Sequence, residues 1–146
     1  MITFETNVQF DRPVEQVFAW LTTSDNHPKW DFTSVEMNQK EPGAWNKGTH
    51  FHEVRNFQGR RMDIQSQIVA FEPNKRMEIQ SLTQPDFHGT WIFTPANGGT
   101  RLTYRAEMKY RGFMRLLELL IRAPFLKQLD ANFRNLKTVL EADTKA

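Results

Sequence analysis

The chain has 146 residues, of which 39% are apolar and 25% are charged, a composition typical of one folded domain and not of a disordered segment. It contains no cysteine, which excludes disulfides, thiolate nucleophiles and cysteine-ligated metal sites and is compatible with the cytoplasm. The net charge is only +2 and basic residues are interleaved with acidic ones, so the charge does not indicate a nucleic-acid partner.

The first thirty residues predict a strand followed by short helices. Met1–Glu5 lack the basic and apolar regions of a signal peptide, so we expect a cytoplasmic protein. Apolar and polar residues alternate from Ile2 to Phe10, which predicts a half-buried strand. Pro13 suits the first turn of a helix whose apolar residues recur at helical spacing up to Leu21. A short second turn through Trp30 follows.

Six further strands are predicted, separated by short turns rich in glycine, proline and asparagine. They span residues 32–38, 49–57, 61–71, 76–82, 87–94 and 100–110. Short turns between successive strands indicate antiparallel neighbours.

The last element is a helical segment from Phe113 to Glu141 that is apolar along one side. Pro124 interrupts it, either as a kink or as the start of a second piece. No repeat, low-complexity run or linker is visible, so residues 1–146 are predicted to form a single domain. The expected fold is α+β, with a seven-stranded antiparallel sheet that curls around the long C-terminal helix and leaves its other face in water.

The alternation within each strand predicts which side chains face that helix. In the last strand Leu102, Tyr104, Ala106 and Met108 share one side and charged residues share the other, so the apolar side faces inward. The strand 49–57 is different, because both of its faces carry polar groups. Phe51, Glu53 and Arg55 share one face, and His50 and His52 share the other. Whichever face is inward supplies the interior with its polar contacts.

Several motifs along the chain resemble the START-like, or Bet v 1-like (SRPBCC), superfamily. They are the helix opening Arg12–Leu21, Trp30 after a proline, Gly48-Thr49, Phe71-Glu72-Pro73, Gly98–Leu102 and Leu136–Glu141. The branch that these motifs resemble most is that of polyketide cyclase/dehydrase and lipid-transport proteins. The resemblance implies a helix-grip fold with an internal cavity for a hydrophobic small molecule. It implies no single reaction, because the superfamily includes carriers, receptors and cyclases and has no shared catalytic motif.

The first functional hypothesis is a carrier or sensor that binds a lipid, polyketide or aromatic molecule in this cavity. The predicted ligand-binding residues are Phe51, Met62, Ile64, Met77, Phe87, Trp91, Phe93, Tyr104, Met108 and Phe133. The alternative is that these side chains fill a solid core.

The second hypothesis is a cofactor-independent cyclase or dehydratase that uses an acid or base in the cavity. The candidates are Glu53 with Arg55, or His50 with His52. The alternative is an ordinary ion pair or two solvated histidines. His50 and His52 have no third ligand at suitable spacing, so neither a metal site nor a cofactor is predicted.

The segment from Arg111 to Lys127 mixes leucine and phenylalanine with basic residues, a pattern compatible with contact to an anionic membrane or with a partner or dimer surface. The favoured interpretation is that its apolar side packs on the sheet and its basic side is solvated. Nucleic-acid binding is rejected, because the aromatic residues lie on the face opposite to Arg60, Arg61, Arg101 and Arg105.

Overall fold

The computed structural model describes residues 1–145, which form seven strands and a few helices. The strands are β1 (Ile2–Phe10), β2 (Ser34–Gln39), β3 (His50–Phe57), β4 (Arg60–Glu72), β5 (Arg76–Ser81), β6 (Asp86–Ala96) and β7 (Gly99–Lys109). The helices are α1 (Val14–Leu21), α2 (His27–Trp30) and α3 (Arg115–Asp143), with short 3₁₀ turns η1 (Ser24–Asn26) and η2 (Gly112–Met114). None of these helices is long and apolar enough to cross a membrane.

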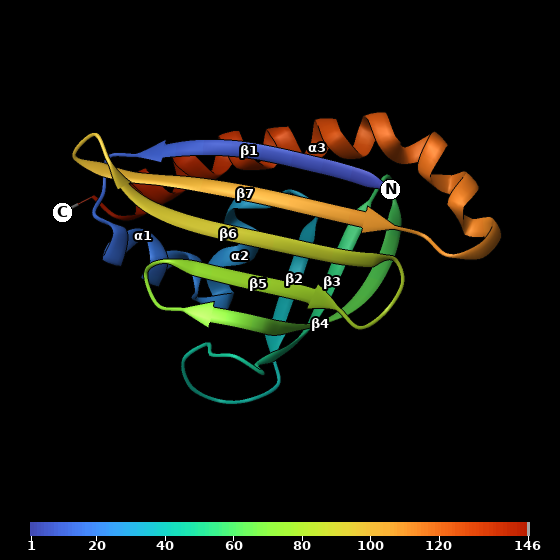
Figure 1. The fold of residues 1–146 in the computed structure, drawn as a ribbon, viewed down its shortest axis with the longest axis horizontal. Coiled ribbons are helices and arrows are strands. Elements are labelled where there is room, and N and C mark those ends of the chain that lie inside the picture. The colour runs from blue at the N-terminus through green and yellow to red at the C-terminus, as the bar shows by residue number, and fades with distance from the viewer. Residues whose placement is uncertain (146) are drawn as a thin grey trace.

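The strands form one antiparallel sheet in the order β1-β7-β6-β5-β4-β3-β2. Strands β2 to β7 pair consecutively, and β1 pairs with β7, so that β1 and β2 are the two edge strands. Helix α3 runs alongside β1 over the length of the sheet (Figure 1). This is the predicted helix-grip architecture, and the predicted fold class is confirmed.

The core lies where the inward side chains of the sheet meet α3. On β7, Leu102, Tyr104 and Ala106 are buried, as the alternation predicts. The ring of Phe133 on α3 stacks on Tyr104 with a centroid distance of 4.4 Å. Since aromatic pairs of this kind bury large apolar areas, this contact fixes the helix against the centre of the sheet.

Strand β2 begins at Ser34, two residues later than predicted, because Asp31 organises a turn before it. The carboxylate of Asp31 accepts hydrogen bonds from the backbone N–H and the hydroxyl of Thr33. The backbone N–H of Ser34 also donates to the carbonyl of Asp31. Such local side-chain bonds compete with strand pairing, so Phe32 is left outside the sheet and 64% exposed.

Helix α3 continues through Pro124 without a break, so no second helix begins there. Its N-terminal part bends away from the axis of the rest (orange in Figure 1). Proline removes one backbone hydrogen bond and crowds the preceding turn, which accounts for a bend within a continuous helix.

The interpretation that the apolar side of this segment packs on the sheet is wrong for its first turns. Phe113, Leu116 and Leu120 are among the most exposed large apolar side chains of the protein. Because the bend and the preceding loop carry these turns beyond the sheet, their outward side chains have nothing to pack against.

Candidate functional site

A cavity of about 150 Å³ lies between the concave face of the sheet and α3. Most of its wall is apolar and aromatic, with residues from α2, α3 and strands β2 to β7. Apolar cavities of about this size hold a single benzene ring. The space therefore suits one small ring or a short chain.

Most of the predicted ligand-binding residues line this cavity. They are Met62, Ile64, Phe87, Trp91, Tyr104, Met108 and Phe133. Phe51, Met77 and Phe93 do not line it, although all three side chains are buried. Neighbouring rings cover two of them, since Phe51 packs on Trp45 and Phe93 packs on Phe18, at centroid distances of 4.7 and 5.1 Å.

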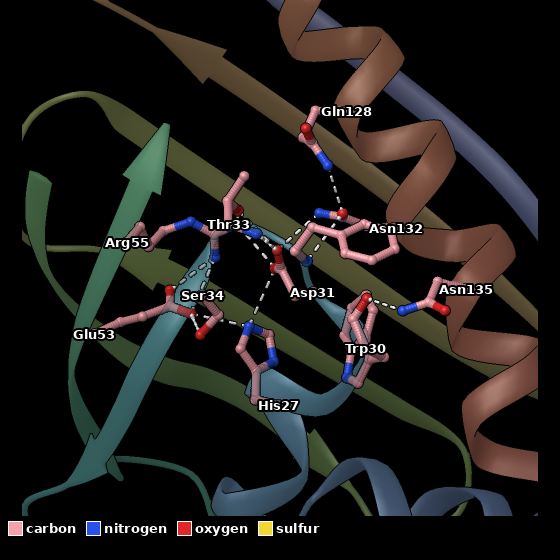
Figure 2. Close-up of polar contacts among 11 residues, drawn as sticks. His27, Trp30, Asp31, Thr33, Ser34, Glu53, Arg55, Gln128, Asn132 and Asn135 are labelled. Carbon is pink, nitrogen blue, oxygen red and sulfur yellow. Dashed lines mark hydrogen bonds and ion pairs between the residues drawn. The ribbon is translucent and has the colours of Figure 1, made fainter. Parts of the chain in front are cut away.

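One part of the wall carries four ionisable side chains, His27, Asp31, Glu53 and Arg55, which we call the charged cluster (Figure 2). Arg55 donates to both carboxylate oxygens of Glu53 at 3.0 Å and to Oδ2 of Asp31 at 2.8 Å. Nε2 of His27 lies 2.9 Å from Oε2 of Glu53 and 3.3 Å from Oδ2 of Asp31. Neither contact has the angles of a regular hydrogen bond, so His27 forms an ion pair shared by the two carboxylates.

Local structure explains how these four side chains converge. His27 and Asp31 are four residues apart, one at the start of α2 and one just after its end, so they fall on the same side of the turn. Glu53 and Arg55 are two residues apart on β3 and share its inner face.

Helix α3 is tied to the charged cluster through Asn132, which is fully buried. The Nδ2 of Asn132 donates to Oδ1 of Asp31 at 2.8 Å, and its Oδ1 accepts from Nε2 of Gln128 at 2.9 Å (Figure 2). The hydroxyl of Ser34 donates to Glu53 at 3.0 Å. Buried charges are tolerated where their polar atoms are satisfied in this way.

The charged cluster is neutral overall at neutral pH. Burial alone would lower the pKa of His27, but the charges of Glu53 and Asp31 outweigh it and raise the pKa to about 9. Burial would raise the pKa of Glu53, but Arg55 and His27 lower it to about 2. The pKa of Asp31 is lowered for the same reasons, and the pKa of Arg55 is raised by the two carboxylates in spite of burial. Two positive and two negative groups therefore face each other.

Tyr104 adds a hydroxyl to the wall beside the charged cluster. Burial raises the pKa of this phenol above its usual range, so it stays protonated and can donate a hydrogen bond. Gly89 on the neighbouring strand leaves room for it, because a Cβ at that position would lie 3.3 Å from the hydroxyl oxygen.

His27, Asp31 and Glu53 also form a group with metal-ligating potential, since one ligand atom from each lies within 4.8 Å of the others. In the arrangement present, Arg55 and the proton on His27 already neutralise both carboxylates. A divalent ion would have to displace that proton and would lie beside the guanidinium. We therefore interpret the group as an ion-pair cluster.

Of the predicted catalytic candidates, Glu53 and Arg55 lie at the cavity and His50 and His52 do not. The two histidines are on the outer face of β3, which settles the direction that the sequence left open. His50 contacts Glu41 at 2.6 Å and His52 contacts Asp63 at 3.0 Å. Sequence reasoning did not select His27 and Asp31, because a single helical turn has no periodicity to interpret. Asn132 could have been identified from the sequence, since a polar residue on the apolar stripe of the long helix indicates a buried polar contact.

Similar proteins support the fold and the family. A family model described as polyketide cyclase/dehydrase and lipid transport matches residues 1–141. No curated protein matches the sequence. The structure is similar to TTHA0849 from Thermus thermophilus, with a TM-score of 0.81, 15% identity, and coverage of 98% of this chain and 99% of the other. It is also similar to Ara h 8.0201, with a TM-score of 0.72, 13% identity and coverage of 96% and 97%.

A third similar structure is StfQ, a di-domain ARO/CYC protein from the steffimycin biosynthetic pathway. Its TM-score is 0.76 at 18% identity, and the match covers 97% of this chain but 52% of StfQ. At these identities the structural likeness shows the fold alone. The family match, by contrast, extends over nearly all of the sequence and agrees with the sheet, the long helix and the cavity between them. The chain therefore belongs to the polyketide cyclase/dehydrase and lipid transport family.

Proposed function

We propose that the cavity binds a small hydrophobic molecule that carries an oxygen atom, and that the protein is a carrier or sensor of this molecule. The observation that supports this most strongly is a mainly apolar cavity whose wall also carries the charged cluster and the hydroxyl of Tyr104. Sites for small molecules commonly combine apolar walls with a few placed polar groups. The walls supply affinity, and the polar groups fix the orientation of the ligand.

The charged cluster favours a neutral polar group on the ligand over a charged one. Its own charges already cancel, so a ligand carboxylate would bring an uncompensated charge into a buried site. A carbonyl or hydroxyl oxygen can instead bond to the Tyr104 hydroxyl or to the edge of the guanidinium of Arg55, whose side chain is 21% exposed.

A larger ligand requires the cavity to open between β3 and α3. The rings of Phe57 and Phe125 meet there in an edge-on contact with a centroid distance of 6.2 Å, and both line the cavity. A lipid or a polycyclic polyketide would have to separate these rings, whereas a single aromatic ring would not.

A calorimetric titration tests the proposal. Phenol and acetophenone are the neutral single-ring ligands. We expect saturable binding, and we expect Ile64→Trp, which places an indole in the cavity, to weaken this binding at least tenfold. The control Val69→Trp on the same strand is directed to solvent and should bind like the parent protein. Lack of binding of either ligand to folded protein would show that the interior is a solid core.

The second candidate function is a cofactor-independent cyclase or dehydratase. The observation that favours it is the proton that His27 holds at the cavity wall. An imidazolium can donate a proton to a carbonyl oxygen while a carboxylate accepts one from the adjacent carbon. The product is an enol, which is the reactive species in aldol cyclisation and dehydration. Glu53 and Asp31 are the carboxylates near enough to His27 to share this task.

Exchange of the methyl protons of acetophenone for deuterium measures this chemistry directly. If the protein is an enzyme, Glu53→Gln will slow the protein-dependent exchange at least tenfold and leave acetophenone binding unchanged. Equal loss of exchange and binding, or no exchange above the buffer rate in the parent protein, would assign the charged cluster to binding alone.

A further inference from the structure

The 3₁₀ turn η2 and the first turns of α3 expose four large apolar side chains, which we call the outer stripe. They are Phe113, Leu116, Leu119 and Leu120, exposed by 84%, 68%, 80% and 75%. Three of them are spaced by three and four residues in α3, so they lie on one side of the helix. Exposed apolar side chains gathered in this way indicate a surface that contacts something other than water.

The opposite side of the same turns is apolar as well. Ile121 and Phe125 lie about half a turn away from the outer stripe and line the cavity. A helix that is apolar on both sides is normally covered on both sides. Within residues 1–145 the inner side lines the cavity, and the outer stripe is left uncovered.

Basic residues surround the outer stripe. Lys109, Arg111, Arg115, Arg122 and Lys127 are all exposed. Arg111 is paired with Asp86 at 2.9 Å, but its side chain is still 68% exposed. The one acidic residue between Lys109 and Lys127 is Glu118, which is turned inward, 9% exposed, and accepts a hydrogen bond from the backbone N–H of Tyr110 at 2.7 Å.

We propose that the outer stripe docks the protein on an anionic lipid bilayer. The leucines and Phe113 would enter the boundary between headgroups and acyl chains, and the basic residues would contact the anionic headgroups. The charge argues against a second copy of this chain, because a symmetric dimer would bring two sets of cations together. The docking surface is the outer side of the helix, so it does not depend on which ligand the cavity binds.

Docking through this surface would also place the cavity next to the lipid. Ile121 and Phe125 follow directly on the turns of the outer stripe, and Phe125 contacts Phe57 at the cavity wall. Insertion of the stripe would therefore bring the contact between these two rings near the bilayer surface, where an apolar ligand could enter from the acyl chains.

Vesicle co-sedimentation tests the proposal, with phosphatidylcholine vesicles compared with vesicles that contain 30% phosphatidylglycerol. We expect binding to the anionic vesicles that weakens as salt is raised. The double variant Leu116→Ser/Leu119→Ser should lower the partition coefficient about tenfold or more. Both side chains are exposed, so the fold and the binding of acetophenone in the cavity should be unchanged.

A second pair of variants separates specific docking from general attraction of a basic protein. Arg115→Gln/Arg122→Gln should lower binding to anionic vesicles about tenfold. The control Lys75→Gln/Arg101→Gln removes the same charge at the other end of the sheet and should bind like the parent protein. Equal binding to both vesicle types, or equal loss in both charge variants, would overturn the proposal. So would a lipid-free dimer that the leucine variant abolishes, which would assign the stripe to a second copy.

Discussion

His27 couples the stability of this protein to pH, because it holds a proton between two buried carboxylates. Its pKa is about 9 in the folded state against an ordinary value of 6.5. A raised pKa means that the folded state binds the proton more tightly. The stabilisation is therefore complete below pH 6.5 and is lost as the pH rises through about 9.

We expect the free energy of unfolding, measured in urea, to fall between pH 7 and pH 10. His27→Gln should be less stable than the parent protein at pH 6 and should lose most of this dependence. A parent protein whose unfolding free energy is flat over that interval would show that His27 is neutral in the folded state.

A second prediction concerns Arg55, because it is the cation that both carboxylates contact. Arg55→Ala leaves Asp31 and Glu53 buried and short of one positive charge, which typically costs about 3–5 kcal/mol. Thermal or urea unfolding measures this loss. Arg61→Ala is the matched control, since the pair of Arg61 and Asp63 is exposed and should contribute little. A similar effect for both variants would contradict the buried role of Arg55.

Among the elements, α3 bends near Pro124, and the next residue, Phe125, lines the cavity and contacts Phe57. We expect Pro124→Ala to stabilise the helix by up to about 3 kcal/mol, because alanine restores the missing backbone hydrogen bond. We also expect weaker ligand binding, because a straighter helix moves Phe125 away from Phe57. Urea unfolding and the calorimetric titration with acetophenone give the two values. Unchanged binding in a more stable variant would show that the bend does not shape the cavity.

The elements also show what the sequence could and could not predict. Alternation in β6 and β7 predicted both the strands and their inward faces, because a sheet with one wet face leaves no other place for charged residues. The facing of β3 could not be predicted, since Glu53 and Arg55 face inward through pairing with Asp31 and His27, which are distant in sequence. The exposed Leu116 and Leu119 also escaped prediction, because apolar spacing does not tell which side of a helix is covered.

For the whole molecule, a ligand in the cavity should stabilise the folded state, because the unfolded chain has no such site. Ligand at one hundred times its dissociation constant adds about 2.7 kcal/mol. We expect acetophenone to raise the melting temperature in a concentration-dependent way, and we expect no rise for Ile64→Trp. A rise of equal size in both proteins would place the ligand outside the cavity.

The pairing of β1 with β7 has a consequence for how this protein is made on the ribosome. Strand β1 is made long before the strand that it pairs with, since Ile2 pairs with Met108 and Phe10 pairs with Thr100. At about 5–20 residues per second, the ribosome needs roughly 5 to 20 seconds after it has made β1 to complete β7. During that time the meander from β2 to β6 can form, while the apolar side of β1 stays available to chaperones and to other nascent chains. The slow, non-local closing step is therefore the point at which this fold is most open to misassembly.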